Sequence, residues 1–175
     1  MKNFLTTIAL TALFVSCSKK ETQPTQNQSD STKIIDSINA ARTKLNDSIK
    51  AKNRENRFKD FNGTHQFTYQ NESSPKYSGS VKFEKIDGER DHYTISGDIK
   101  SGKNNVTIKG FVAVVSNKHM NFTGEITQSI AENDNGKSYT RKGTKTFMSK
   151  DGGKTWRLQD MVNGSGFVDY IDIHF

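Results

Sequence analysis

The sequence predicts a mainly β protein, in which an antiparallel up-and-down meander of about eight strands closes as a barrel, preceded by one N-terminal helix. Three observations support this prediction. Apolar and polar residues alternate with a period of two from Phe58 to Phe175, the links between the alternating runs are short, and the apolar residues before Phe58 recur at intervals of three and four. A two-sheet sandwich is the alternative arrangement of the same strands.

The first sixteen residues have the layout of a secretory signal. Lys2 supplies a positive charge, an apolar run from Phe4 to Val15 follows it, and the small residue Ser16 precedes Cys17. The apolar run is shorter than the ~20 residues that a membrane-spanning helix needs. We therefore expect residues 1–16 to be a signal peptide.

The end of this run, "FVSC", resembles the lipobox of bacterial lipoproteins. The resemblance implies that Cys17 is acylated and becomes the first residue of the mature chain, with enough acyl chains for stable anchoring. The resemblance also implies location at the outer membrane, because Ser18 and not an Asp follows the cysteine. The alternative is a plain signal peptide with a coincidental cysteine. Cys17 is the only cysteine, so neither an internal disulfide nor a cysteine-based metal site can form.

A tether and a helix are expected between the anchor and the strands. Residues 17–31 form the tether, because the stretch from Ser18 to Lys33 has no apolar residue. The segment 32–57 is amphipathic, with a helix from about Thr32 to Arg54. Its seam, spaced three and four apart, either packs on the following domain or pairs weakly with a second copy of the chain. The seam consists of Ile35, Ile38, Arg42, Leu45 and Ile49.

Three short motifs in this segment resemble the Asp-Ser/Thr-apolar acceptor of O-glycosylation in Bacteroidota. They are "DST" and two copies of "DSI", with acceptor hydroxyls at Ser31, Ser37 and Ser48. Ser37 and Ser48 lie off the apolar seam, so a sugar fits there. Ordinary solvated serines are the alternative.

Glycines recur at one position within four of the predicted strands. The pattern is apolar-x-Gly-x-apolar, so each glycine faces the core together with its apolar neighbours. Because a glycine weakens a strand, a repeated one needs a reason. Inward glycines let a sheet coil and close, or leave room for an aromatic ring of the next strand. The four are Gly79, Gly97, Gly110 and Gly124.

The links between the strands are hairpin turns. "DG" at Asp87, "SGKN" at Ser101 and "SNK" at Ser116 are turn sequences, and one longer loop separates Ile130 from Ser138. No link is long enough for a crossover helix. The strands therefore follow one another as an antiparallel meander, which closes most simply as a barrel.

The stretch "SKDGGKTW", Ser149 to Trp156, resembles the Asp box, a hairpin motif repeated through sialidases and related β-propellers. The chain holds one copy and is too short for a propeller, so the motif predicts a hairpin rather than a glycosidase. In this hairpin Asp151 shapes the turn at Gly153, Ser149 and Thr155 support it, and Trp156 enters the core.

The stretch "FKDFNGTHQFTY", from Phe58, resembles the first-strand signature of lipocalins, with His65 at the position of that family's Trp. The closing stretch "TWRLQDM…DYIDIHF" resembles small barrel-like Bacteroidota lipoproteins of unassigned function. These resemblances imply a barrel that holds a small lipophilic or amphipathic ligand. The candidate ligand-binding residues are His65, Tyr69, Tyr77, Phe83, Tyr93, Phe122 and Arg141; plain core packing is the alternative for each aromatic.

The strand before the Asp-box hairpin admits two orientations. If Phe147 faces inward, so does Arg141, which then lies near Asp169 and indicates a polar element inside the barrel. We expect the opposite orientation, with Thr144, Thr146 and Met148 inward.

The sequence offers little other chemistry. The four histidines form no metal-ligand pattern, and no phosphate loop or nucleophile elbow occurs. Asp169 and Asp172 fall on opposite faces of one strand, which is wrong for a catalytic carboxylate pair. We therefore expect no catalytic residues, no metal and no cofactor.

The formal charge of +7, or +6 without Lys2, suits anionic lipid surfaces or glycans, while the expected compartment argues against nucleic acid. The leading hypothesis is a lipid-anchored envelope protein that binds a ligand inside its barrel. The alternatives are a structural or interaction module with a solid barrel that binds an envelope protein or glycan, and a hydrolase of envelope glycans.

Overall fold

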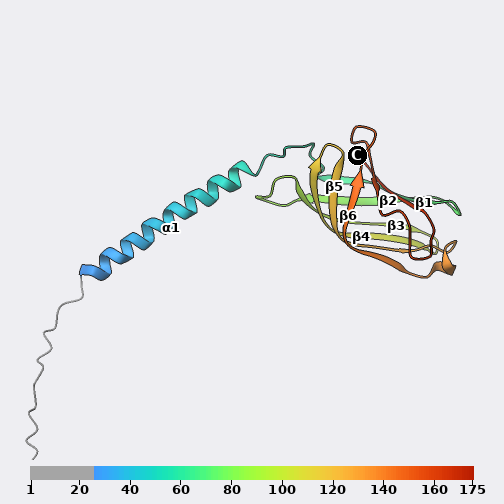
Figure 1. Ribbon diagram of the computed structural model, residues 1–175, viewed down its shortest axis with the longest axis horizontal. Helices are drawn as coiled ribbons and strands as arrows, with labels where there is room; N and C mark the ends of the chain where they lie inside the picture. Colours follow the sequence, from blue (N-terminus) through green and yellow to red (C-terminus); the bar gives the residue numbers. More distant parts are fainter. Residues whose placement is uncertain (1–25) are drawn as a thin grey trace, which may run out of the picture. The chain divides into compact units, whose positions relative to one another are not determined.

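A computed structural model describes residues 26–175 and confirms the predicted fold: one helix followed by a closed antiparallel barrel of eight strands (Figure 1). The expected signal peptide 1–16, Cys17 and the first part of the expected tether lie outside the described residues. The elements are α1 (Gln26–Lys52), β1 (Gly63–Asn71), β2 (Ser74–Lys85), β3 (His92–Ser101), β4 (Asn104–Ser116), β5 (His119–Ser129), the 3₁₀ turn η1 (Asp134–Gly136), β6 (Tyr139–Met148), β7 (Thr155–Leu158) and β8 (Asp169–His174).

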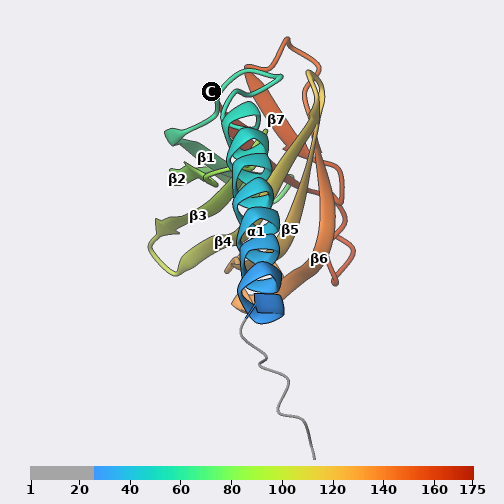
Figure 2. The ribbon, with the colours of Figure 1, turned by 90° about the vertical axis from the view of Figure 1, so that its left-hand side faces the viewer.

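Each strand of the barrel pairs with the next, and β1 pairs with β8 to close it. The closing register runs from Gln66 opposite His174 to Asn71 opposite Asp169. Figure 2 shows the strands β1 to β7 following one another around the wall. The meander expected from the short turns is therefore correct, and the sandwich alternative is excluded.

The helix α1 differs from the prediction at both ends. It begins at Gln26, inside the stretch expected to be a tether, and ends at Lys52. The residues before Ile34 carry no apolar periodicity, yet Gln is a good helix former, so the helix begins earlier than the seam indicates. After Lys52 the chain leaves the helix, and the backbone N–H groups of Arg57 and Phe58 donate to the buried carboxylate of Asp91 instead.

The repeated glycines lie where neighbouring strands approach one another too closely for a side chain. A Cβ atom on Gly79 would lie 2.1 Å from the carbonyl oxygen of Asp98, and one on Gly97 would lie 2.4 Å from that of Ser80. Gly110 pairs with Gly124, and a Cβ atom on Gly110 would also lie 2.8 Å from the ring of Phe122. Both expected roles are confirmed, because these glycines let the wall bend and leave room for a ring.

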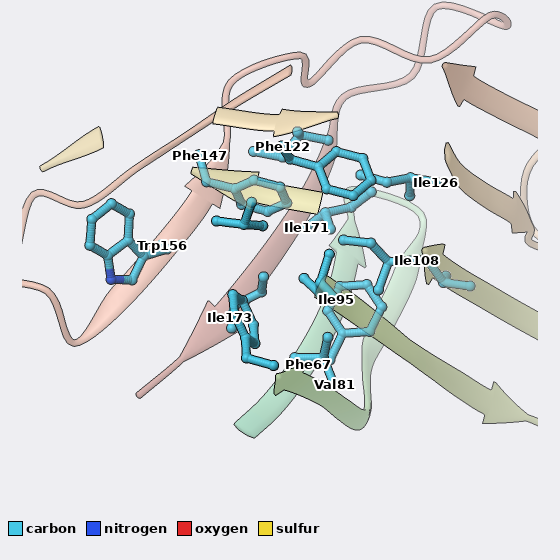
Figure 3. Close-up of a cluster of buried hydrophobic side chains, with 14 of the residues drawn as sticks. Phe67, Val81, Ile95, Ile108, Phe122, Ile126, Phe147, Trp156, Ile171 and Ile173 are labelled. Carbon is cyan, nitrogen blue, oxygen red and sulfur yellow. The ribbon is translucent and has the colours of Figure 1, made fainter. Parts of the chain in front are cut away.

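The barrel interior is one apolar core. Phe67, Val81, Ile95 and Ile108, from four successive strands, point toward one another, and Figure 3 shows this cluster. All four are at most 2% exposed. Among the described residues no helix is both long and apolar enough to cross a membrane.

Candidate functional site

One end of the barrel interior is closed by aromatic rings. His65 lies there, with its Nε2 2.8 Å from the carbonyl oxygen of Phe61 and its ring 4.3 Å from that of Phe175. Phe61 packs edge-on against Trp156 and Phe175. The candidate His65 is therefore part of the packing that seals this end, where the lipocalin signature has its Trp.

Tyr93 fixes the connecting segment to this aromatic end. Its hydroxyl donates to Asp60 Oδ1 at 2.9 Å and accepts from Asn56 Nδ2 and the backbone N–H of Phe61. Burial is the main cause that raises the pKa of Tyr93 to about 12. The candidate Phe83 stands beside it, with ring centroids 6.0 Å apart. Both candidates thus contact other residues of the core.

The middle of the barrel interior is also filled by aromatic side chains. The candidate Phe122 is fully buried and packs edge-on against Phe147, with ring centroids 6.2 Å apart. Its ring also lies over Gly110 and Gly124, at the position that a Cβ atom would need. Phe122 fills the space that the glycines leave.

The other end of the interior holds a buried ion pair. Arg141 NH2 donates to Asp169 Oδ2 at 2.7 Å, and both side chains are completely shielded from solvent. Arg141 also donates to Gln128 Oε1 and to the carbonyl oxygen of Asp160. The expected orientation of β6 was therefore wrong: Arg141 and Phe147 face inward, whereas Thr144 is exposed. The pairing of Arg141 with Asp169 makes this orientation possible, because the buried guanidinium has acceptors.

Both carboxylate oxygens of Asp169 accept hydrogen bonds, and the side chains around it are hydrogen-bonded as well. Asp169 accepts from Tyr69 Oη at 2.6 Å, from Gln128 Nε2 at 2.8 Å and from Asn163 Nδ2 at 3.3 Å. The Tyr69 hydroxyl accepts in turn from the side-chain amides of Asn71 and Asn133. Burial, followed by the hydrogen bond to Asp169, raises the pKa of Tyr69. These polar groups satisfy one another without a ligand.

The long loop after β5 covers this polar end. Glu132 accepts from the hydroxyl of the candidate Tyr77 at 2.9 Å and from Asn104 Nδ2 at 3.1 Å. The neighbouring Asn133 is buried and accepts from Asn71 Nδ2 at 2.7 Å. The loop predicted between Ile130 and Ser138 thus plugs the end that would be the mouth of a ligand-binding barrel.

The Asp-box stretch forms the expected hairpin turn. Asp151 Oδ1 accepts from the backbone N–H groups of Lys154 and Thr155 and from the Ser149 hydroxyl, which also accepts from the N–H of Gly153. The hydrogen bond from the Thr155 N–H is the main cause that lowers the pKa of Asp151 to about 2. Trp156 is buried and donates to the carbonyl oxygen of Gly153 at 3.2 Å. The contacts are those of a turn, as the motif predicted.

The two carboxylates of β8 face opposite sides of the wall. Asp169 lies inside with Arg141, whereas Asp172 accepts two hydrogen bonds, of 2.8 and 2.7 Å, from Arg157. The Arg157 guanidinium lies 4.5 Å from the ring centre of Tyr170. This confirms the opposite faces expected from their spacing. Within residues 26–175 no group of acidic, histidine or cysteine side chains could hold a metal ion.

A hollow of about 570 Å³ lies on the outer face of the wall formed by β1 to β5, and we call it the wall hollow. The sequence did not predict this hollow, because it forms only where outward side chains of five neighbouring strands meet. The available signal was the run of Ser and Thr on those outward positions. Its lining residues are Thr64, Ser80, Lys82, Ser96, Gly97, Asp98, Thr107, Ile108, Lys109, Glu125 and Thr127.

The fold and the interior define the class: a closed eight-stranded antiparallel β-barrel whose core consists of its own side chains. Within this class the chain belongs to the PM1083 family, whose family model matches residues 42–175. "Uncharacterized protein PM1083" of Pasteurella multocida strain Pm70 is 34% identical over 114 residues, which are 65% of this chain and 72% of that protein. Among solved structures, a redesigned β-barrel is similar with a TM-score of 0.42 and 16% identity, over 65% of this chain and 90% of its own.

Proposed function

We propose that this protein is a non-enzymatic, lipid-anchored binding module of the outer membrane, in which a solid barrel presents its outer wall to a partner. One observation carries the proposal: the interior is occupied by side chains that satisfy one another. Arg141 and Asp169 are completely buried and paired, and the candidates Tyr69 and Phe122 contact other core residues. A ligand inside the barrel would have to displace these contacts.

The proposed anchor rests on the sequence of the first seventeen residues. An apolar run followed by Ser16 and Cys17 supports acylation at Cys17, as in lipoproteins. The helix α1 then acts as a spacer, since 27 helical residues extend about 40 Å at 1.5 Å each. Ser31, Ser37 and Ser48 are exposed on this helix and accessible to the proposed glycosylation.

The helix also supports weak pairing with a second copy. Its large seam side chains Ile35, Ile38, Leu45 and Ile49 are 46–61% exposed and follow the spacing of a coiled-coil seam. Anchoring at the N-terminal side in one membrane would hold two such helices parallel. Arg42 occupies one seam position, which keeps the pairing weak.

Native mass spectrometry of the protein, gently extracted from membranes, tests the solid barrel. The expected mass is that of the acylated chain without a further bound molecule. Phe122→Trp fills the interior further and should expel a molecule bound there. A stoichiometric lipophilic molecule that this variant loses would overturn the proposal and restore the lipocalin-like hypothesis. A matched replacement outside the core, Phe111→Trp, serves as the control, because Phe111 is 57% exposed.

The same preparation tests the proposed absence of catalysis. Incubated with a broad panel of glycosides, it should release no product above the rate of a heat-denatured sample. Turnover that a single Asp or Glu replacement abolishes would contradict a non-enzymatic role and favour the hydrolase alternative.

A further inference from the structure

The wall hollow lies where the glycines let the strands bend. Gly97 pairs with Val81 on one side and with Ile108 on the other, and Gly97 and Ile108 both line the hollow. Since a Cβ atom on Gly97 would collide with the backbone of β2, this bend depends on glycine. The glycine pattern therefore has a consequence on the outside of the barrel as well as in its core.

The lining of the hollow is rich in hydroxyl groups. Five Ser and Thr side chains contribute them, one from each of the five strands: Thr64, Ser80, Ser96, Thr107 and Thr127. A hydroxyl group both donates and accepts a hydrogen bond and rotates to suit its partner. Such a lining matches a ligand that carries many hydroxyl groups of its own.

The charged groups that line the hollow are of both signs in equal number. Lys82 and Lys109 contribute two positive charges, and Asp98 and Glu125 contribute two negative charges. Three of these groups also pair with charges beside the hollow, Lys82 with Glu84, Asp98 with Lys100 and Glu125 with Lys142, so the lining presents paired charges and no large excess of one sign. A lining of this kind does not favour a polyanion such as a phosphate chain, which needs an excess of positive charge.

The exposed ring of Phe111 lies on the same outer face. Phe111 follows Lys109 by two residues on β4, pairs with Thr94 and Thr123, and is 57% exposed. Alternation along a strand places positions 107, 109 and 111 on one face. An apolar ring next to hydroxyl groups suits the two sides of a sugar ring, whose C–H face is apolar and whose edges carry hydroxyl groups.

A polypeptide strand is a poorer match for this place. A peptide that adds to a sheet needs an unpaired strand edge. The strands β2, β3, β4 and β5 each pair with a neighbour on both sides, from Ser80 on β2 to Thr127 on β5. The hollow also offers few apolar groups to anchor a peptide side chain, since its only large apolar lining residue, Ile108, is buried.

We propose that the wall hollow, extended by Phe111, is a binding site for an uncharged or evenly charged glycan chain of the cell envelope. This proposal rests on the proposed function, because a solid barrel leaves the outer wall as the binding surface. The volume lies in the ~300–1,000 Å³ range of ligand sites in proteins. The open face lets a long chain cross the hollow instead of being enclosed by it.

Binding of full-length, detergent-solubilised protein to an array of bacterial polysaccharides and peptidoglycan fragments tests the site. Two replacements probe it: Phe111→Ala removes the exposed ring, and Asp98→Asn weakens a charged lining group. Each should weaken binding and so raise the apparent Kd of any bound glycan about tenfold, as expected for the loss of one aromatic or charge-assisted contact. Val162→Ala is the matched control, because Val162 is 56% exposed but lies outside the hollow.

The outcomes separate this proposal from the function that it rests on. A glycan whose binding falls with Phe111→Ala and Asp98→Asn, but not with Val162→Ala, supports the site. Binding that none of the three changes, or an array without any bound glycan, overturns it. In either case a mass spectrum without an interior ligand leaves the solid-barrel proposal standing, whereas a stoichiometric interior ligand overturns that proposal by itself.

Discussion

Arg141 and Asp169 form an ion pair of 2.7 Å across the interior of the barrel, between β6 and β8, with no exposure of either side chain. Removing two charges from water is costly, and the attraction between them repays this cost only if their remaining hydrogen-bonding groups are also satisfied. Gln128 meets this condition at both ends, because it accepts from Arg141 and donates to Asp169. The pair thus holds together the two strands that flank the short β7.

Replacing one member of this pair should destabilise the barrel strongly. Asp169→Asn leaves the guanidinium of Arg141 buried without a counter-charge, so the free energy of unfolding should fall by about 3–5 kcal/mol. Urea unfolding followed by the fluorescence of Trp156, the only tryptophan, measures the change. The combined replacement Arg141→Met and Asp169→Leu should recover part of the loss, since neither charge then remains.

An exposed ion pair of the same barrel provides the control. Lys142 and Glu125 lie 2.8 Å apart with side chains that are mostly solvent-exposed. Glu125→Gln should therefore cost less than about 1 kcal/mol. Equal losses for the buried and the exposed pair would contradict the role given to Arg141 and Asp169.

The glycine pair at the bend of the wall should not tolerate a methyl group. In Gly110→Ala the new Cβ atom would lie 2.3 Å from the carbonyl oxygen of Thr123 and 2.8 Å from the ring of Phe122, so the strands must move apart. We expect a loss of about 3 kcal/mol in the free energy of unfolding, at the upper end for overpacking. Ser96→Ala, on the exposed face of the neighbouring strand, should stay within about 0.5 kcal/mol.

The hairpin turn after β6 should depend on Ser149. This side chain is 1% exposed and bridges Asp151 to the N–H of Gly153. Ser149→Ala leaves that buried N–H without its acceptor, so it should cost about 1–2 kcal/mol. A thermal melt monitored by circular dichroism gives the loss, and Lys150→Ala in the same turn should change the melting temperature little.

Asp151 should make the stability of this turn depend on acid. Its pKa falls from an ordinary 3.8 to about 2 in the folded protein, so the folded state favours the ionised carboxylate. The resulting stabilisation is complete above pH ~4 and is lost as the pH falls toward 2. Asp151→Asn should therefore lower stability at pH 5 and reduce the difference between pH 5 and pH 2.5. An unchanged difference would show that other carboxylates dominate the acid transition.

The fold was predictable because its signals are local. Period-two alternation, short turns such as Ser101–Asn104 and the Asp-box motif each specify a neighbouring pair of strands, and a meander needs only neighbouring pairs. The inward glycines were also correctly assigned, since Gly97 and Gly110 share the parity of their apolar neighbours. Topology, closure and turns therefore followed from the order of residues along the chain.

The site was less predictable, because it depends on contacts between distant residues. The orientation of β6 was predicted wrongly from the rule that charges avoid a core, and Asp169 compensates for Arg141 from 28 positions away. The loop residues Glu132 and Asn133 plug the barrel through Tyr77 and Tyr69, for which no local pattern exists. The wall hollow likewise combines residues of five strands, and only the closed barrel brings them together.

The seam of α1 should mediate weak self-association. Leu45→Glu places a charge on the seam and should shift the protein lacking residues 1–25 toward the monomer. Sedimentation velocity over a range of concentrations measures this shift. Lys44→Glu makes the same kind of change next to the seam and should leave the distribution of species unchanged. Identical monomeric profiles for the unmodified protein and both variants would rule out pairing through this face.

Cys17 should determine where the protein is located. If the cysteine carries the anchor, Cys17→Ala prevents acylation, and the protein should appear in the soluble fraction or remain as an unprocessed precursor. The barrel should still fold, because its strands begin at Gly63, far along the chain from Cys17, and pair with one another all the way around. Growth with labelled fatty acid, followed by membrane fractionation, measures whether the protein is acylated and in which fraction it lies. The Ser16→Ala protein, which keeps a small residue before the cysteine, should retain the label. A Cys17→Ala protein that still carries the label, or an unmodified protein without it, would refute the anchor.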